Sequence, residues 1–215
     1  REIQKNRKTE AGRYAQMKTI GFIGMGNMAQ AIVRGLHRAE AIKKENVLAF
    51  APHLDKLHKN AGEIGFIACD TTAELIEKSD MIVLACKPYQ IEAVYRQLGG
   101  ALAGKLIVSV AFGWNFARAK PLLPTDTHYQ YIVPNTPVSI CSGVLLVEEQ
   151  NNLTGEEEAL LEELFGGLGL YMKLPFAQMG AANAMSGCGP AFMAMVIEAL
   201  GDGGVKHGLT RTQAY

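Results

Sequence analysis

A glycine-rich turn near the beginning of the chain has residue types and spacing suited to binding a dinucleotide. In Gly24-x-Gly26-x-x-Ala29, Gly24 permits a tight turn and Gly26 lets the backbone approach a pyrophosphate. Ala29 lets a helix pack closely on a strand, and the first amides of that helix can bind phosphate oxygens. The pattern follows an apolar strand and opens a helix, which favours a dinucleotide site. The alternative is a structural turn in a relative that binds no nucleotide.

The end of the second expected strand carries information on the cofactor. Sites that prefer NAD usually place an acidic residue there, bonded to the ribose 2′-hydroxyl, but residues 50–53 contain no acid. His53 and Lys56 follow closely and could face a 2′-phosphate. We therefore expect NADP(H) to be favoured over NAD(H). The alternative is that both side chains only form the solvated face of the second helix.

Polar residues follow two later strands. Ligands in open α/β sheets bind beyond the carboxyl ends of the strands, so Lys87, which precedes Pro88, could contact a ribose or the nicotinamide. Asn135 lies in a polar loop fixed by Pro134 and Pro137, and could hydrogen-bond the nicotinamide or the substrate. A solvated lysine at a strand end and a purely structural turn are the alternatives.

A run of small residues comes further along the chain: Ser186, Gly187, Cys188 and Gly189. Pro190 follows and suits a first helical turn, so the run predicts a helix N-terminus that could hold a substrate carboxylate. Tight packing between helices is the alternative. Cys188 has no evident histidine partner in the sequence, and the four cysteines lack the spacing of zinc ligands, so we predict no metal site.

Short apolar runs alternate with helical patterns through the first two thirds of the chain. This alternation is typical of βαβ units and a parallel sheet, and continuous apolar strands indicate a sheet covered on both faces. The expected strands are residues 19–24, 47–50, 66–68, 81–86, 106–110, 129–133 and 144–147. The expected helices are residues 28–38, 53–61, 73–78 and 156–165, the last two capped by Thr71 or Thr72 and by Thr154.

The pattern changes after Pro175. Residues 177–200 carry one charge, Glu198, and predict a mostly buried helix that is interrupted around residues 187–190, with another helix after Thr210. The predicted fold class is α/β, a Rossmann-type doubly wound sheet followed by the start of an all-helical domain. We expect a polar N-terminal extension over residues 1–16, a dinucleotide-binding domain over 17–176 that opens at Met17, and a partial helical domain over 177–215.

The composition excludes several classes of protein. The chain is 48% hydrophobic and 20% charged, as in ordinary soluble proteins, and its zero net charge argues against general binding of nucleic acid or acidic membranes. We find no apolar run of transmembrane length and no secretory signal. Cys69 and Cys86 lie in or beside apolar runs, which predicts buried, reduced thiols and favours the cytoplasm.

Taken in order, these segments resemble the pyrroline-5-carboxylate reductase family. The resemblance runs from about Lys18 to Tyr215 and is carried most specifically by two segments, Pro134-Asn135-Thr136-Pro137 and Ser186-Gly187-Cys188-Gly189-Pro190-Ala191-Phe192. It implies a Rossmann domain followed by a helical dimerisation domain, and therefore a homodimer or a larger homo-oligomer. It also implies hydride transfer from NAD(P)H to the C=N carbon of 1-pyrroline-5-carboxylate, which gives L-proline in the last step of proline biosynthesis.

The same resemblance implies positions for individual residues. Asn27 and Met28 would lie at the pyrophosphate turn, and Ala51 near the adenosine ribose. The nicotinamide-side ribose would be lined by Ala85, Lys87 and Pro88, and the reaction centre by Asn135, Ser186, Gly187, Cys188 and Gly189. Thr72 stands where relatives often have an asparagine near the cofactor.

The family continues beyond the position of Tyr215 with more helices and a loop that contacts the substrate. We therefore expect this chain to bind cofactor and to turn over little or no substrate by itself. Two other interpretations remain. A β-hydroxyacid dehydrogenase would need a catalytic lysine on the helix after the Rossmann domain, and none occurs between Lys173 and Lys206. A non-catalytic dinucleotide sensor would need no substrate turn, and the small residues at 186–189 argue against it.

Overall fold

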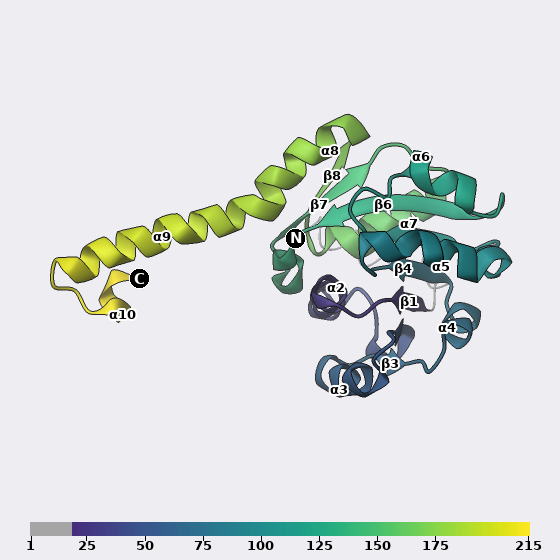
Figure 1. The fold of residues 1–215 in the computed structure, drawn as a ribbon, viewed down its shortest axis with the longest axis horizontal. Coiled ribbons are helices and arrows are strands. Elements are labelled where there is room, and N and C mark those ends of the chain that lie inside the picture. The colour runs from purple at the N-terminus through teal and green to yellow at the C-terminus, as the bar shows by residue number, and fades with distance from the viewer. Residues whose placement is uncertain (1–18) are drawn as a thin grey trace, which may run out of the picture.

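The computed structural model of the protein describes residues 19–215. The expectations for residues 1–16 and for Met17 lie outside the described residues. One mixed sheet has the strand order β3-β2-β1-β4-β5-β6-β7-β8 (Figure 1). Its strands are β1 Ile20–Ile23, β2 Val47–Phe50, β3 Ile67–Ala68, β4 Met81–Leu84, β5 Leu106–Ser109, β6 His128–Pro134, β7 Gly143–Glu148 and β8 Gly169–Leu174.

The six strands from β3 to β6 pair in parallel, whereas β7 runs antiparallel to β6 and β8 runs parallel to β7. Helices cover both faces of the sheet. The α-helices that do so are α2 Asn27–Arg38, α3 Leu54–Ile64, α4 Thr72–Lys78, α5 Ile91–Leu98, α6 Phe116–Ala119 and α7 Gly155–Gly166. One apolar core joins α2, α3 and α7 to the sheet, and a second joins α4, α5 and α6 to the opposite face. The doubly wound Rossmann-type fold predicted from the sequence is confirmed.

The predicted helix starts rest on specific caps. The Thr154 hydroxyl accepts the Glu157 N–H, while the Glu157 carboxylate accepts the Thr154 N–H at 2.8 Å, so the two residues form a capping box. The Thr71 hydroxyl likewise accepts the Glu74 N–H at 3.1 Å. These bonds satisfy amide groups that the first turn of a helix leaves without a backbone partner.

Three elements were not predicted from the sequence: β8, α5 and the four-residue α6. In β8 the side chains are half-buried or exposed rather than uniformly buried, because this strand forms the edge of the sheet. Its sequence therefore lacks the continuous apolar run that identified the central strands. Helix α5 spans only eight residues, of which two, Ile91 and Tyr95, are buried, so its helical period is too short to recognise.

The predicted interruption of the long C-terminal helix is wrong. Helix α8 (Phe176–Asn183), a π-helical turn (Ala184–Cys188) and α9 (Gly189–Lys206) form one continuous rod that projects away from the sheet, and the short α10 (Arg211–Ala214) folds back beside its far end (Figure 1). The chain passes Pro190 without a break because the π turn lets the Gly189 N–H bond the carbonyl of Ala184, five residues back.

One further expectation fails on this helix. No apolar run of transmembrane length was expected. Phe176–Lys206, however, is 31 residues long and could cross a membrane by length and composition. A helix this apolar must be buried against something in the assembled protein, and within a single chain α9 exposes a row of large apolar side chains. They are Phe192, Met193, Met195, Val196, Ile197 and Leu200, each at least 50% exposed. Such a face needs a cover that the described chain does not supply.

A buried carboxylate in the Rossmann domain gives a pH prediction. Glu148 is 1% exposed, and its Oε2 accepts the Phe116 N–H at 2.7 Å while its Oε1 has no partner. Burial is the main cause that raises the pKa of this carboxyl above its usual 4.5, against the hydrogen bond from Phe116, which lowers it. The stability that Glu148 contributes is therefore fully present below pH 4.5 and is lost as the pH rises through the folded-state pKa.

We expect Glu148→Gln to remove this part of the pH dependence, because the amide does not ionise. Chemical unfolding at several pH values from about 4.5 upward should show a shallower fall in stability for the variant than for the wild-type chain. Glu149→Gln, at the exposed neighbouring position, is the control and should keep the wild-type slope. Equal slopes for all three chains would show that Glu148 titrates normally.

Candidate functional site

The residues expected to bind cofactor follow successive parallel strands at one edge of the sheet. The chain leaves β1 toward β2 and returns through β4 on the other side of β1, so the strand order reverses between β1 and β4. Ligands of doubly wound sheets bind at such a reversal, beyond the carboxyl ends of the strands. The residues placed there are Gly24, Gly26, Asn27, Met28 and Ala29 after β1; Ala51, His53 and Lys56 after β2; Thr72 after β3; and Ala85, Lys87 and Pro88 after β4.

The two glycines of the turn have different physical roles. Gly24 has φ +96°, and an added Cβ would lie 2.8 Å from backbone atoms of Ala85 and Cys86, so this position requires glycine to fold. Gly26 has an extended backbone that any residue adopts, and a Cβ there would meet nothing within 4 Å. The space in front of Gly26 is thus open, as a site for a pyrophosphate requires.

Helix α2 begins at this open space with its amides unoccupied by a side-chain cap. Gly26 is the N-cap residue and offers no side chain, and the first turn carries no acidic residue. The N-terminal amides and the helix dipole therefore favour an anion. Ala29 is fully buried against the sheet, which its small side chain permits. This arrangement fits a dinucleotide pyrophosphate.

The ribose end of the site has no carboxylate on β2 or in the loop directly after it. His53 is the N-cap residue of α3 and makes no side-chain cap bond, and both His53 and Lys56 are exposed. Thr72 is the first residue of α4, and its neighbour Thr71 is the cap. These placements bring the predicted residues to the expected edge, and their roles toward a cofactor stay predictions.

The loop after β4 is held by a residue that the sequence analysis did not select. The Trp114 indole N–H donates to the carbonyl of Pro88 at 2.7 Å, and the ring is 2% exposed. Lys87 beside it is exposed. The signal was available, since Trp114 is the single tryptophan of the chain and lies five residues after the end of β5 at Ser109. Desolvation raises the pKa of the Cys86 thiol to about 11, so the cysteine nearest this edge stays protonated at neutral pH.

The substrate-side residues meet through one hydrogen bond. Asn135 follows β6 at the same edge, and its side-chain Nδ2 donates to the carbonyl of Ser186 at 2.8 Å. Its Oδ1 accepts the Val144 N–H, also at 2.8 Å. The loop after β6 and the segment of small residues are therefore in contact, although 51 positions separate Asn135 and Ser186 in the sequence.

The expected helix N-terminus in this segment is not present. Ser186, Gly187 and Cys188 lie within the π turn, and the Gly189 N–H is bonded inside the helix. Pro190 has no N–H. A substrate carboxylate thus finds no free first turn of amides here, because the helix continues instead of beginning at Pro190. Gly187 and Cys188 are exposed, so the segment remains accessible.

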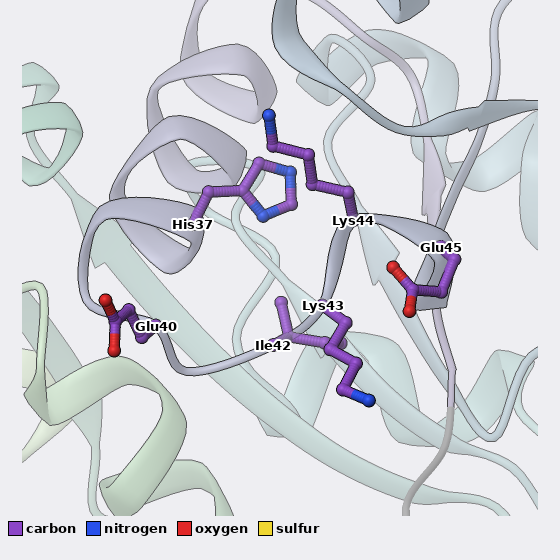
Figure 2. A pocket seen from close by; sticks show the side chains of 6 residues that line it. All are labelled: His37, Glu40, Ile42, Lys43, Lys44 and Glu45. Atoms are coloured by element: carbon purple, nitrogen blue, oxygen red, sulfur yellow. The ribbon is translucent and has the colours of Figure 1, made fainter.

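The cavity shown in Figure 2 lies away from this edge. Its volume is about 330 Å³, and its lining residues surround the C-terminal end of α2, at the opposite end of that helix from Gly26. The His37 Nε2 donates to the Gly65 carbonyl at 2.7 Å, which ties α2 to the end of α3. The lining residues are His37, Glu40, Ile42, Lys43, Lys44 and Glu45. Its position excludes it as the dinucleotide site.

Across residues 19–215, no cluster of three or more His, Cys, Asp or Glu side chains could hold a metal ion.

Two family models match the chain. One described as "NADP oxidoreductase coenzyme F420-dependent" matches residues 19–113, and one described as "Pyrroline-5-carboxylate reductase dimerisation" matches residues 177–215. The second match falls on α8, α9 and α10, the part of the chain with the exposed apolar face, and it supports assembly of identical subunits.

Comparison with curated proteins decides the family. The chain is 36% identical over 200 residues to a pyrroline-5-carboxylate reductase of Treponema pallidum, covering 91% of this chain and 76% of that protein. The chain belongs to the pyrroline-5-carboxylate reductase family. A zebrafish (Danio rerio) relative, pyrroline-5-carboxylate reductase 3, is 35% identical over 196 residues, covering 91% of this chain and 68% of that protein.

Solved structures of the family share the fold. The Plasmodium falciparum pyrroline carboxylate reductase with NADP bound matches with a TM-score of 0.82 at 28% identity. The match covers 93% of this chain and 73% of the Plasmodium chain. The Coxiella burnetii enzyme has a TM-score of 0.81 at 29% identity, with 93% and 74% covered. A 3-hydroxyisobutyrate dehydrogenase of Mycobacterium tuberculosis, at 14% identity and a TM-score of 0.61, shares the fold alone.

Proposed function

We propose that this protein reduces 1-pyrroline-5-carboxylate to L-proline, the last step of proline biosynthesis, with a hydride from NAD(P)H. The observation that carries the proposal is the meeting of two sites at one sheet edge. The open glycine turn before α2 and the Asn135–Ser186 contact both lie beyond the carboxyl ends of the parallel strands. The curated relatives supply the substrate by their name.

In this reaction the residues of the chain mainly position the substrate and the cofactor relative to each other. When bound, the nicotinamide supplies the hydride, which adds to the C=N carbon while the cofactor is oxidised. That carbon is already electrophilic once its nitrogen is protonated, so the protein need not form a bond to the substrate or hold a metal ion. Orientation of the ring over the nicotinamide then accounts for most of the rate enhancement.

Each part of the edge has a place in this reaction. Gly26, Asn27 and Met28 hold the pyrophosphate at the start of α2, and Lys87 with Pro88 borders the nicotinamide-side ribose. The π turn and Asn135 border the substrate. The thiol of Cys86 is protonated, in accord with a mechanism that uses no thiolate nucleophile.

The proposal is tested by steady-state kinetics. NADPH and NADH oxidation are followed with 1-pyrroline-5-carboxylate, and proline is quantified as the product. We expect cofactor oxidation and proline formation in equal amounts. Oxidation of the cofactor without formation of proline would contradict the assignment of substrate.

We further propose that NADP(H) is favoured over NAD(H). The loop after β2 carries no carboxylate to bind a 2′-hydroxyl, and the exposed His53 and Lys56 follow it. The double change His53→Ala with Lys56→Ala should weaken NADPH binding more than NADH binding. Exposed charge contacts each contribute about 0.2–1 kcal/mol, so we expect a change in preference of several-fold. Calorimetric titration with both cofactors measures it, and equal losses would refute the assignment.

We assign the cofactor to residues 17–176 and subunit pairing to residues 177–215, and we place the protein in the cytoplasm. All four cysteines are free, which suits a reducing compartment. The apolar face of α9 would form the pairing surface of a homodimer or a larger homo-oligomer. A membrane is a poorer partner for this helix because the family model that matches it describes dimerisation.

A further inference from the structure

A backbone carbonyl in the π turn, that of Ser186, accepts a hydrogen bond from a side chain of the Rossmann domain, that of Asn135. In a regular helix, the carbonyl of Ser186 would accept the N–H of residue 190. That residue is Pro190, which has no N–H. A carbonyl left without a donor inside a structure costs free energy. Here the Asn135 Nδ2 supplies the donor at 2.8 Å.

Asn135 is itself fixed from both sides. The side chain is 8% exposed, its Oδ1 accepts the Val144 N–H at 2.8 Å, and its backbone N–H donates to the Val144 carbonyl at 3.1 Å. Val144 belongs to β7, which pairs with β6 just before Asn135. The amide group that holds Ser186 therefore has one rotamer, set by the sheet.

The contact sets where the long helix departs from the sheet. On the preceding turns, Met179 is 1% exposed in the core of the α4, α5 and α6 face, and Phe176 lies 6.4 Å from the ring of Tyr131. After the π turn, α9 is almost entirely exposed. Ser186 lies between these two parts. A shift of its carbonyl would move residues 186–189 relative to the edge where the cofactor is proposed to bind.

We propose that Asn135 is a positioning residue: it bonds the Ser186 carbonyl that Pro190 leaves without a backbone donor, and so holds the π turn beside the cofactor edge. This role rests on the proposed function and differs from the direct contact with nicotinamide or substrate expected from the sequence. π turns occur often at functional sites, and here one side chain fixes the turn to the sheet.

The test compares two asparagines that use their amides in the same way. Asn152 accepts the Tyr129 N–H at 2.8 Å and donates to the Thr127 carbonyl at 2.9 Å, at the opposite end of β6 from Asn135. Asn135→Asp and Asn152→Asp each lose the donor and keep an acceptor. Asn135→Ser, uncharged and shorter, replaces the first variant if the buried carboxylate prevents folding.

We expect Asn135→Asp to raise the KM for 1-pyrroline-5-carboxylate by about 10- to 100-fold, because small misplacements cost rate steeply. The Kd for NADPH should stay within about twofold, since the glycine turn is untouched. Asn152→Asp, at an exposed position, should leave both constants unchanged. If both variants lower kcat/KM alike, Asn135 is merely structural. Oxidation of NADPH by the wild-type chain without formation of proline contradicts the proposed function instead.

A second measurement tests the hydrogen bond without any turnover. Pro190→Ala supplies an N–H that can bond the Ser186 carbonyl within the helix. The loss of unfolding midpoint caused by Asn135→Asp should therefore be smaller in the Pro190→Ala background than in the wild-type background. The Asn152→Asp loss should be the same in both. An Asn135→Asp loss that is independent of residue 190 would overturn the inference.

Discussion

We expect Gly26→Val to weaken cofactor binding and to leave the fold intact. The Cβ of residue 26 would meet no protein atom within 4 Å, and its backbone conformation suits any residue. The branched side chain would occupy the space through which a pyrophosphate reaches the first amides of α2. We expect NADPH affinity to fall by at least about tenfold, with an unchanged melting temperature, as measured by calorimetry and thermal unfolding.

Gly24→Ala is the matched control, since it changes the same turn but is expected to lower the stability of the fold. The added Cβ would lie 2.8 Å from the backbone of Ala85 and Cys86, at a φ of +96°. We expect this variant to lose about 1–3 kcal/mol of stability. Unchanged NADPH binding by a folded Gly26→Val chain would show that the turn does not hold the cofactor.

The second large effect concerns the exposed face of α9. Met195 is 66% exposed and Leu200 is 72% exposed, on a helix that the dimerisation family model matches. We expect the chain to self-associate through this face. Burying an unpaired charge in an interface costs about 3–5 kcal/mol, so Met195→Glu with Leu200→Glu should raise the dimer dissociation constant at least about 100-fold. Sedimentation velocity over a range of concentrations measures this change.

Ile67→Glu provides the comparison for that experiment. Ile67 is 45% exposed on β3, at the edge of the sheet farthest from β8 in the strand order, so it introduces the same charge on another exposed apolar position. It should leave association unchanged. A wild-type chain that stays monomeric at high concentration would refute pairing through α9, and equal effects of both changes would assign association to another surface.

The features that the sequence predicted well are those determined by near neighbours. The buried strands, the glycine turn and the Thr154 cap depend on residues within a few positions of each other, and all are confirmed. Gly24 and Gly26 were correctly assigned to a turn between a strand and a helix. Their different tolerance for a Cβ was not visible, because the atoms that surround Gly24 come from the end of β4.

The wrong prediction at Pro190 has the same physical origin. Proline removes one backbone donor, and whether a helix ends or continues there depends on whether the freed carbonyl finds another partner. That partner, Asn135, is distant in the sequence and reaches Ser186 only in the folded chain. The predicted helix N-terminus was therefore reasonable locally and wrong in the tertiary structure. The exposure of α9 likewise depends on what packs against it, which its own residues do not encode.

The most direct test of the account follows the hydride itself. The chain is incubated with 1-pyrroline-5-carboxylate and NADPH that carries deuterium at both positions of C4 of the nicotinamide, and the product is analysed by mass spectrometry. Because product accumulates, the measurement also detects the slow turnover expected of this chain. The account predicts L-proline carrying one deuterium at Cδ, absent with Gly26→Val. Proline that accumulates without deuterium would contradict it.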